Sequence, residues 1–185
     1  MLPGLVALEL VLARTEKVAM CLPLISAYPS GLEVDLVTMA SAASRDLDPY
    51  LFAPHRLALR RRTASESPPE DMLRFGVQFA DGSKATNASG RLPDPARDPA
   101  PSPPVMHAEG GGGGTGGWRQ RFWIWPLPPA GPLTFVVEWA AAGIPLTRHE
   151  IDAKLIRDAA QRAQVIFSTE DLPELSPSQA QPRLG

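Results

Sequence analysis

The sequence predicts a mainly β protein, an antiparallel β-sandwich of about seven or eight strands with one C-terminal α-helix. Short segments of alternating apolar and polar residues recur along the chain, and glycine and proline turns separate them. A capped, amphipathic helical pattern then ends the foldable part. The length of 185 residues suits one domain. An open sheet covered by the helix is the alternative architecture.

Three alternating segments open the chain and predict an antiparallel meander. In the second segment, residues 18–25, Pro23 favours an edge strand or a bulge. In the third segment, residues 32–37, Glu33 and Asp35 are expected on the solvent face, because side chains two apart on a strand point the same way. The first segment places these apolar residues on one face: Val6, Leu8, Leu10 and Leu12.

A β-hairpin is predicted farther along the chain. Apolar residues alternate from Leu73 to Phe79, and Asp81-Gly82 follows soon after. This dipeptide between two strands favours a type I′ turn, which places the return strand at 83–87. A short strand is also expected around Leu57 and Leu59.

Residues 88–117 predict a long disordered insertion. Prolines recur from Pro93 to Pro104 and prevent regular strand pairing, and a run of glycines follows from Gly110. We expect one β-rich domain over residues 1–167, because neither side of the insertion has enough strands to bury a core alone. Residues 168–185, rich in proline, serine and glutamine, are expected to form a disordered tail.

Order is expected to return at a tryptophan-rich strand after the insertion. One face carries Arg119, Arg121, Trp123 and Trp125, and the other carries Gln120, Phe122 and Ile124. Because both faces hold large rings, we expect this strand to be covered on both sides. A further strand over residues 133–139 places Trp139 in the core. The pattern leaves open whether Trp118, Trp123 and Trp125 are exposed.

A helix from Thr147 to about Val165 is predicted to follow. Thr147 is the expected N-cap, and Glu150, three residues later, completes a capping box. Leu146 and Ile151 occupy the positions of a hydrophobic staple.

Composition and residue spacing exclude several classes of function. A net charge of −2 provides no electrostatic attraction for nucleic acid, and no apolar run is long enough to span a membrane. The lone Cys21 cannot form an internal disulfide, which fits the cytoplasm. Three scattered histidines and one cysteine have no metal-ligand spacing, so neither metal nor cofactor is expected.

Two hypotheses of function remain. The first is a non-catalytic interaction domain that binds another protein, or its own copy, through the tryptophan-rich strand, because aromatic and arginine side chains suit binding surfaces. Its binding residues are Trp118, Arg119, Arg121, Trp123 and Trp125. The second is a small hydrolase or transferase that uses scattered carboxylates and His149. No catalytic residue is assigned.

Two stretches of sequence resemble an uncharacterised bacterial family. Residues 118–144 contain Trp-x-x-x-x-Trp-x-Trp-Pro-Leu-Pro-Pro, then Gly-Pro-Leu-Thr-Phe-Val, Glu-Trp and Gly-Ile-Pro. Residues 74–82 read Arg-Phe-Gly-Val-Gln-Phe-Ala-Asp-Gly. The resemblance implies a bacterial origin and a shared β-rich scaffold, and it assigns no activity. The many alanines, prolines and glycines, and a preference for arginine over lysine, are typical of a GC-rich genome.

Overall fold

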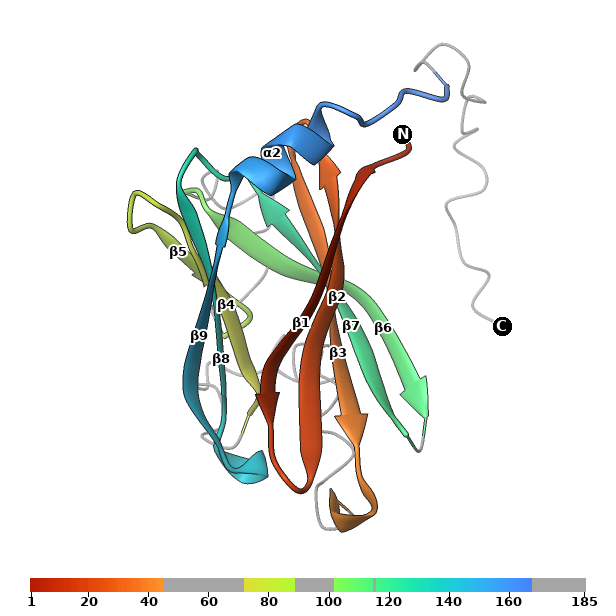
Figure 1. Ribbon diagram of the computed structural model, residues 1–185, viewed down its shortest axis with the longest axis vertical. Coiled ribbons are helices and arrows are strands. Elements are labelled where there is room, and N and C mark those ends of the chain that lie inside the picture. Colours follow the sequence, from red (N-terminus) through yellow and green to blue (C-terminus); the bar gives the residue numbers. More distant parts are fainter. Residues whose placement is uncertain (45–71, 89–101, 115, 168–185) are drawn as a thin grey trace, which may run out of the picture.

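The computed structural model describes residues 1–44, 72–88, 102–114 and 116–167. It confirms a mainly β fold with two antiparallel sheets and a C-terminal helix (Figure 1). One sheet has the order β1-β2-β3-β7-β6, and the other has the order β5-β4-β8-β9. The elements are β1 (Gly4–Arg14), β2 (Val18–Tyr28), β3 (Gly31–Ala40), β4 (Arg74–Gln78), β5 (Lys84–Thr86), β6 (Val105–Gly114), β7 (Gly117–Trp125), β8 (Pro132–Trp139), β9 (Ile144–Asp152) and α2 (Lys154–Ala160).

The core lies between the two sheets. Alternate residues of each strand point inward, and the ring of Phe75 on β4 packs against Phe122 on β7 and Phe135 on β8. Trp139 is fully buried, as predicted. Each fully buried large apolar side chain contributes about 1.5–3 kcal/mol to folding, so these alternating segments determine which sheet faces meet.

The predicted meander and hairpin are both present. Strands β1, β2 and β3 pair antiparallel in order, and the pairing of β2 with β3 shifts in register between Cys21 and Ile25, around Pro23. Strands β4 and β5 form the hairpin. Its turn differs from the expected type I′: Gly82 has φ 85° while Asp81 is not left-handed, and the Gly82 amide donates to the Phe79 carbonyl. A type I turn ending in one left-handed glycine explains both facts.

The glycine run, predicted to be part of a flexible insertion, instead forms the second half of β6. This strand pairs antiparallel with β7, from Val105 opposite Trp125 to Gly114 opposite Gly117. The expectation of a disordered insertion is therefore wrong for residues 105–114, while residues 89–101 and 115 lie outside the described residues. Glycine by itself does not favour a strand. The strand forms because β7, which has a strong strand pattern, provides backbone hydrogen-bonding partners along it.

The predicted capping box at Thr147 and Glu150 is also wrong, because both residues lie in strand β9. Thr147, His149 and Ile151 are half-buried and alternate with exposed Arg148 and Glu150, so the period is two rather than that of a helix. The helix begins only at Lys154, whose amide donates to Asp152 Oδ1.

Helix α2 closes one end of the sandwich beside β1 and β2 (Figure 1). It buries Ile156, Ala159 and Ala160. Gly4 is required beneath it, because a Cβ at that position would lie 1.8 Å from the Ala159 carbonyl oxygen. Among the described residues no helix is long and apolar enough to cross a membrane. The predicted tail, and the strand expected at Leu57 and Leu59, lie outside the described residues.

A candidate binding face on strand β7

Strand β7 separates the five candidate residues onto two faces. Gln120, Phe122 and Ile124 are buried against the other sheet. The outer face carries Arg119, Arg121, Trp123 and Trp125, of which both arginines are exposed and Trp125 keeps 40% of its surface. The expectation that both faces are covered is therefore wrong. The five-stranded sheet has the core on one side, and its other side is an outer surface of the sandwich.

Trp118 does not join this outer face. Its indole lies against the inner side of β6, where a Cβ on Gly111 would be 3.0 Å from Trp118 Nε1 and one on Gly113 would be 2.9 Å from the same ring. Two glycines of β6 therefore make room for this ring. Trp118 is half-buried and belongs to the packing between β6 and β7.

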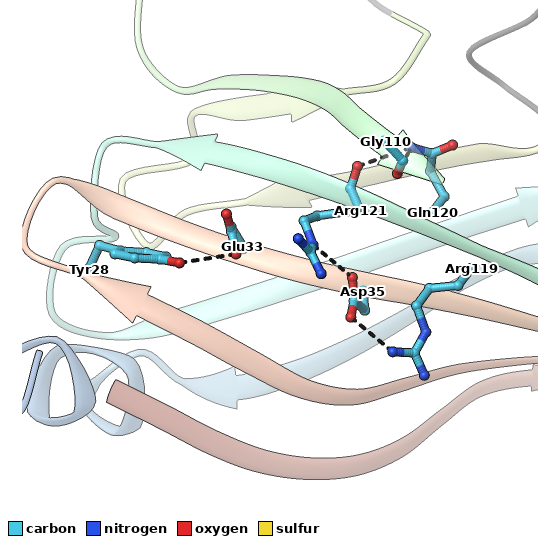
Figure 2. A network of polar contacts seen from close by, with 7 residues as sticks. All are labelled: Tyr28, Glu33, Asp35, Gly110, Arg119, Gln120 and Arg121. Carbon is cyan, nitrogen blue, oxygen red and sulfur yellow. Dashed lines mark hydrogen bonds and ion pairs between the residues drawn. The ribbon is translucent and has the colours of Figure 1, made fainter. Parts of the chain in front are cut away.

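An ionic cluster of three residues is the centre of the outer face (Figure 2). Arg119 Nη1 lies 3.4 Å from Asp35 Oδ2, and Arg121 Nε lies 3.3 Å from Asp35 Oδ1. The Asp35 side chain is only 9% exposed, while those of Arg119 and Arg121 are 59% and 50% exposed. Asp35 points to the outer face as predicted, yet the expectation of a wet carboxylate is wrong, because the two arginines cover it.

Strand register produces this cluster. β3 pairs antiparallel with β7 so that Asp35 is directly opposite Arg121, with Val37 opposite Arg119. Exposed ion pairs contribute only about 0–1 kcal/mol to stability. Asp35 therefore does more to position the guanidinium groups than to hold the fold together. Its hydrogen bond and charge also raise the pKa of Arg121.

Aromatic side chains extend the face from this cluster toward the far end of β7. The ring of Trp123 lies over Gly31 of β3, where a Cβ would approach Trp123 Cζ2 to 2.8 Å. The Tyr28 ring is 5.6 Å from it between centroids, at 59°. The Tyr28 hydroxyl donates to Glu33 Oε2 at 3.2 Å. Burial, followed by the nearby Glu33 carboxylate, raises the pKa of Tyr28.

Strand β6 adds a third acidic group, Glu109, to Asp35 and Glu33 on this surface. His107 is opposite Trp123, and its Nε2 lies 3.7 Å from Glu109 Oε1. The face thus combines aromatic rings, cations and carboxylates in adjacent rows. Asp35 and Tyr28 were not predicted as site residues. The pairing of β3 with β7 brings Asp35 to the arginines, and the pairing of β2 with β3 brings Tyr28 to Trp123.

Two groups of the enzyme hypothesis, His149 and Glu150, do not meet in the part of the chain that the structure describes. His149 Nε2 lies 2.7 Å from the Leu12 carbonyl oxygen of β1, while Glu150 lies on the opposite face of β9. A cavity of about 300 Å³ there is lined by residues that include Gln78, Arg148 and Glu150, and His149 is not among them. Within the described ranges, no three His, Cys, Asp or Glu side chains gather as a metal site.

No family model matches the chain, and neither does any curated protein or solved structure. The resemblance to an uncharacterised bacterial family therefore stays a prediction.

Proposed function

We propose that this protein is a non-catalytic binding domain that captures a partner protein on the outer face of its five-stranded sheet. The proposal rests on one observation. The nearly buried Asp35 holds two half-exposed arginines, Arg119 and Arg121, on the face of the sheet that points away from the core. Trp123 and Trp125 lie beside them on the same face. We further propose that it acts in the cytoplasm, as the single Cys21 predicts.

The chemistry of the face suits protein recognition. Tryptophan, tyrosine and arginine are the residues most enriched among those that dominate binding energy at protein interfaces. Each guanidinium has five N–H donors, and Asp35 occupies only part of them, so the remainder can meet carboxylates or carbonyl groups of a partner. Fixing the arginines before binding reduces the side-chain entropy that association would otherwise cost.

Exposed apolar groups enlarge this surface. Trp125 lies at one end of the outer face of β7, and Met39, 47% exposed, lies on β3 opposite Gly117 at the other end. A partner that covers both would bury apolar area on either side of the ionic cluster. This arrangement favours a macromolecule over a small molecule, because the groups are spread along a strand rather than gathered around a cavity.

The test compares outer-face variants with a matched control on the other sheet. Arg121→Ala and Trp125→Ala should each weaken capture by about 2 kcal/mol, roughly thirtyfold in affinity. Partners are recovered from a lysate by the purified chain and identified by mass spectrometry, and affinities are then measured by calorimetry. Arg74→Ala is the control, because Arg74 is about as exposed as Arg121 and forms an ion pair with Glu138 at 3.0 Å on the second sheet.

If Arg121→Ala and Arg74→Ala both bound the partner with wild-type affinity, the proposed binding face would be rejected. Equal loss in both would point to nonspecific charge effects and would reject it as well. Urea unfolding of each variant establishes that the fold is intact before capture is compared.

A further inference from the structure

The second half of β6 is an open edge of the five-stranded sheet. Residues from Glu109 to Gly114 are all exposed, whereas Met106 and Ala108, in the first half, pack against the core. β7 forms the ladder on one side of β6. Among the described residues, no other backbone group hydrogen bonds to the backbone of residues 109–114, and one side chain does, that of Gln120, whose Nε2 donates to the Gly110 carbonyl at 2.7 Å. Such an edge presents free N–H and C=O groups that can pair with another strand.

The glycines of this edge fall into two groups. Gly111 and Gly113 are required by packing, since a Cβ would lie 2.8 Å from the Arg119 carbonyl oxygen in one case and 2.2 Å from that of Gly117 in the other. A Cβ would meet nothing within 4 Å, and φ is not positive, at Gly110, Gly112 and Gly114. Neither contacts within the chain nor backbone conformation explains these three glycines. Unexplained strand glycines are typical of sites where another backbone approaches closely.

We propose that this edge pairs antiparallel with the same edge of a second copy of the chain, which joins two five-stranded sheets into one continuous sheet. A strand edge is complementary to itself around a two-fold axis, and such isologous contacts are the commonest in dimers. The second copy supplies a strand that is already extended and ordered. A free peptide would first have to lose conformational entropy. The proposal does not rest on the function proposed above.

Charge complementarity favours the second copy and indicates a register. Arg119 and Arg121 both form ion pairs with Asp35, and the Glu109 side chain at the start of the glycine run is 39% exposed while it lies 3.7 Å from His107 in its own chain. Glu33 and Glu109 of the same chain also act on Arg121 at longer range, so Arg119 is the arginine with the fewer nearby carboxylates. If Gly111 lies on the two-fold axis, Gly110 of one copy lies opposite Gly112 of the other. The ladder partner of Gly112 is Arg119.

Glu109 of one copy then lies opposite Gly113 of the second copy, one residue along the strand from the row of Gly112 and Arg119. The strand that carries Arg119 is two strand spacings, about 9.6 Å, away. The glycines between them have no side chains, so the carboxylate and the guanidinium can meet diagonally over them. The two-fold axis repeats this ion pair. Because the shared edge is short, the dimer should be weak and depend on protein concentration.

Crosslinking tests the register directly. Gly110→Cys and Gly112→Cys are prepared separately, each with Cys21→Ser, and both tolerate a side chain because their Cβ positions are open. The proposal expects a disulfide-linked heterodimer when the two variants are mixed under mild oxidation, and little covalent dimer from either variant alone. Directly opposite residues of a β-pair lie within disulfide range, whereas residues offset by two do not. Leu146→Cys, exposed on β9, is the control for random collision.

Sedimentation equilibrium tests the charge pair. Wild-type protein should dimerise as concentration rises, and Glu109→Arg should weaken the dimer about tenfold, because it removes an attraction at two symmetric positions. Glu150→Arg makes the same charge change on the outer face of the other sheet and should leave association unchanged.

A chain that stays monomeric at every concentration would overturn the proposal. So would mixed variants that crosslink no faster than the Leu146→Cys control, or a Glu109→Arg variant that dimerises like wild type. A monomer whose Gly112→Cys variant captures an extended cysteine-containing peptide would assign the edge to a different partner.

Discussion

The two edge strands of the five-stranded sheet, β1 and β6, differ in how many of their edge backbone groups are hydrogen bonded to other parts of the chain. Along β1, His149 meets the Leu12 carbonyl at 2.7 Å and Arg162 Nη2 donates to the Leu5 carbonyl at 3.0 Å. Just before the strand, Leu2 exchanges two backbone hydrogen bonds with Gln164. Among the described residues, the second half of β6 has one side-chain hydrogen bond of this kind, from Gln120 Nε2 to the Gly110 carbonyl at 2.7 Å, and no backbone hydrogen bonds beyond its ladder with β7.

Geometry reinforces the difference between these edges. β1 is interrupted by two shifts of register, and Glu9 within it adopts φ 50°, so the strand is not a regular template for pairing. β6 has one such shift, before Gly110, and then runs regularly to Gly114. Proteins commonly protect edge strands with bulges and covering segments. The contrast teaches that described segments of the chain cover the edge of β1, whereas no described segment pairs with the outer side of the second half of β6.

The largest loss of stability is expected at Gly4, where α2 packs against β1. Gly4→Ala places a Cβ on the Ala159 carbonyl, so the helix must move, and the free energy of unfolding should fall by about 3 kcal/mol. Urea unfolding measures the loss. Gly112→Ala is the control on β6, where the space is open and stability should change by no more than about 0.5 kcal/mol. Equal losses at the two positions would contradict the difference between the edges.

A smaller loss is expected on the inner side of β6. Gly113→Ala directs a Cβ at the Gly117 carbonyl 2.2 Å away and should cost about 2 kcal/mol, because β6 and β7 must separate locally. Gly114→Ala, on the outer side of the same strand, should be nearly neutral in the same urea measurement. If Gly113→Ala left the free energy of unfolding unchanged, packing would not be the reason for glycine on the inner side of β6.

His149→Ala tests the hydrogen bond between the His149 ring and the Leu12 carbonyl at the edge of β1. Removing the imidazole leaves the Leu12 carbonyl without this partner and should lower the free energy of unfolding by about 1 kcal/mol. Arg148→Ala changes the adjacent residue on the opposite face of β9 and serves as control. If His149→Ala instead left stability unchanged, the histidine would not be an edge-sealing group.

The smallest effect is expected at Arg162, which is exposed. Arg162→Ala removes the donor to the Leu5 carbonyl and should cost about 0.5 kcal/mol. Hydrogen exchange is the sensitive measurement, since local opening near Leu5 should speed up while the core of β2 stays protected. Arg157→Ala is the control. It removes a donor in α2 to the Pro128 carbonyl and should leave exchange in β1 unchanged.

Sequence patterns worked best where burial alternates strictly. Strand β4 and the position of its turn at Asp81-Gly82 were predictable because local side chains and a glycine requirement agree, although the predicted type I′ turn was wrong. Strand β9 was mistaken for a helix start because Thr147 and Glu150 satisfy a capping pattern by chance. The burial of Thr147, His149 and Ile151 against the sandwich outweighed that local preference.

The binding face was predictable only in part. The alternation that puts Arg119, Arg121, Trp123 and Trp125 on one side is visible in the sequence, as is the shared face of Glu33 and Asp35. Their contact is not visible, because many residues separate β3 from β7 and only the sheet order makes them neighbours.

The sequence by itself thus determined the fold class, the meander, the hairpin and the order of side chains along β7, because strand periodicity is a local property of the chain. The tertiary structure decided that the glycine run is a strand and that one face of β7 is open. It also decided that Asp35 lies beneath two arginines. These features depend on pairing between distant segments, and burial on one side of a sheet is set by the neighbour that covers it rather than by the strand itself.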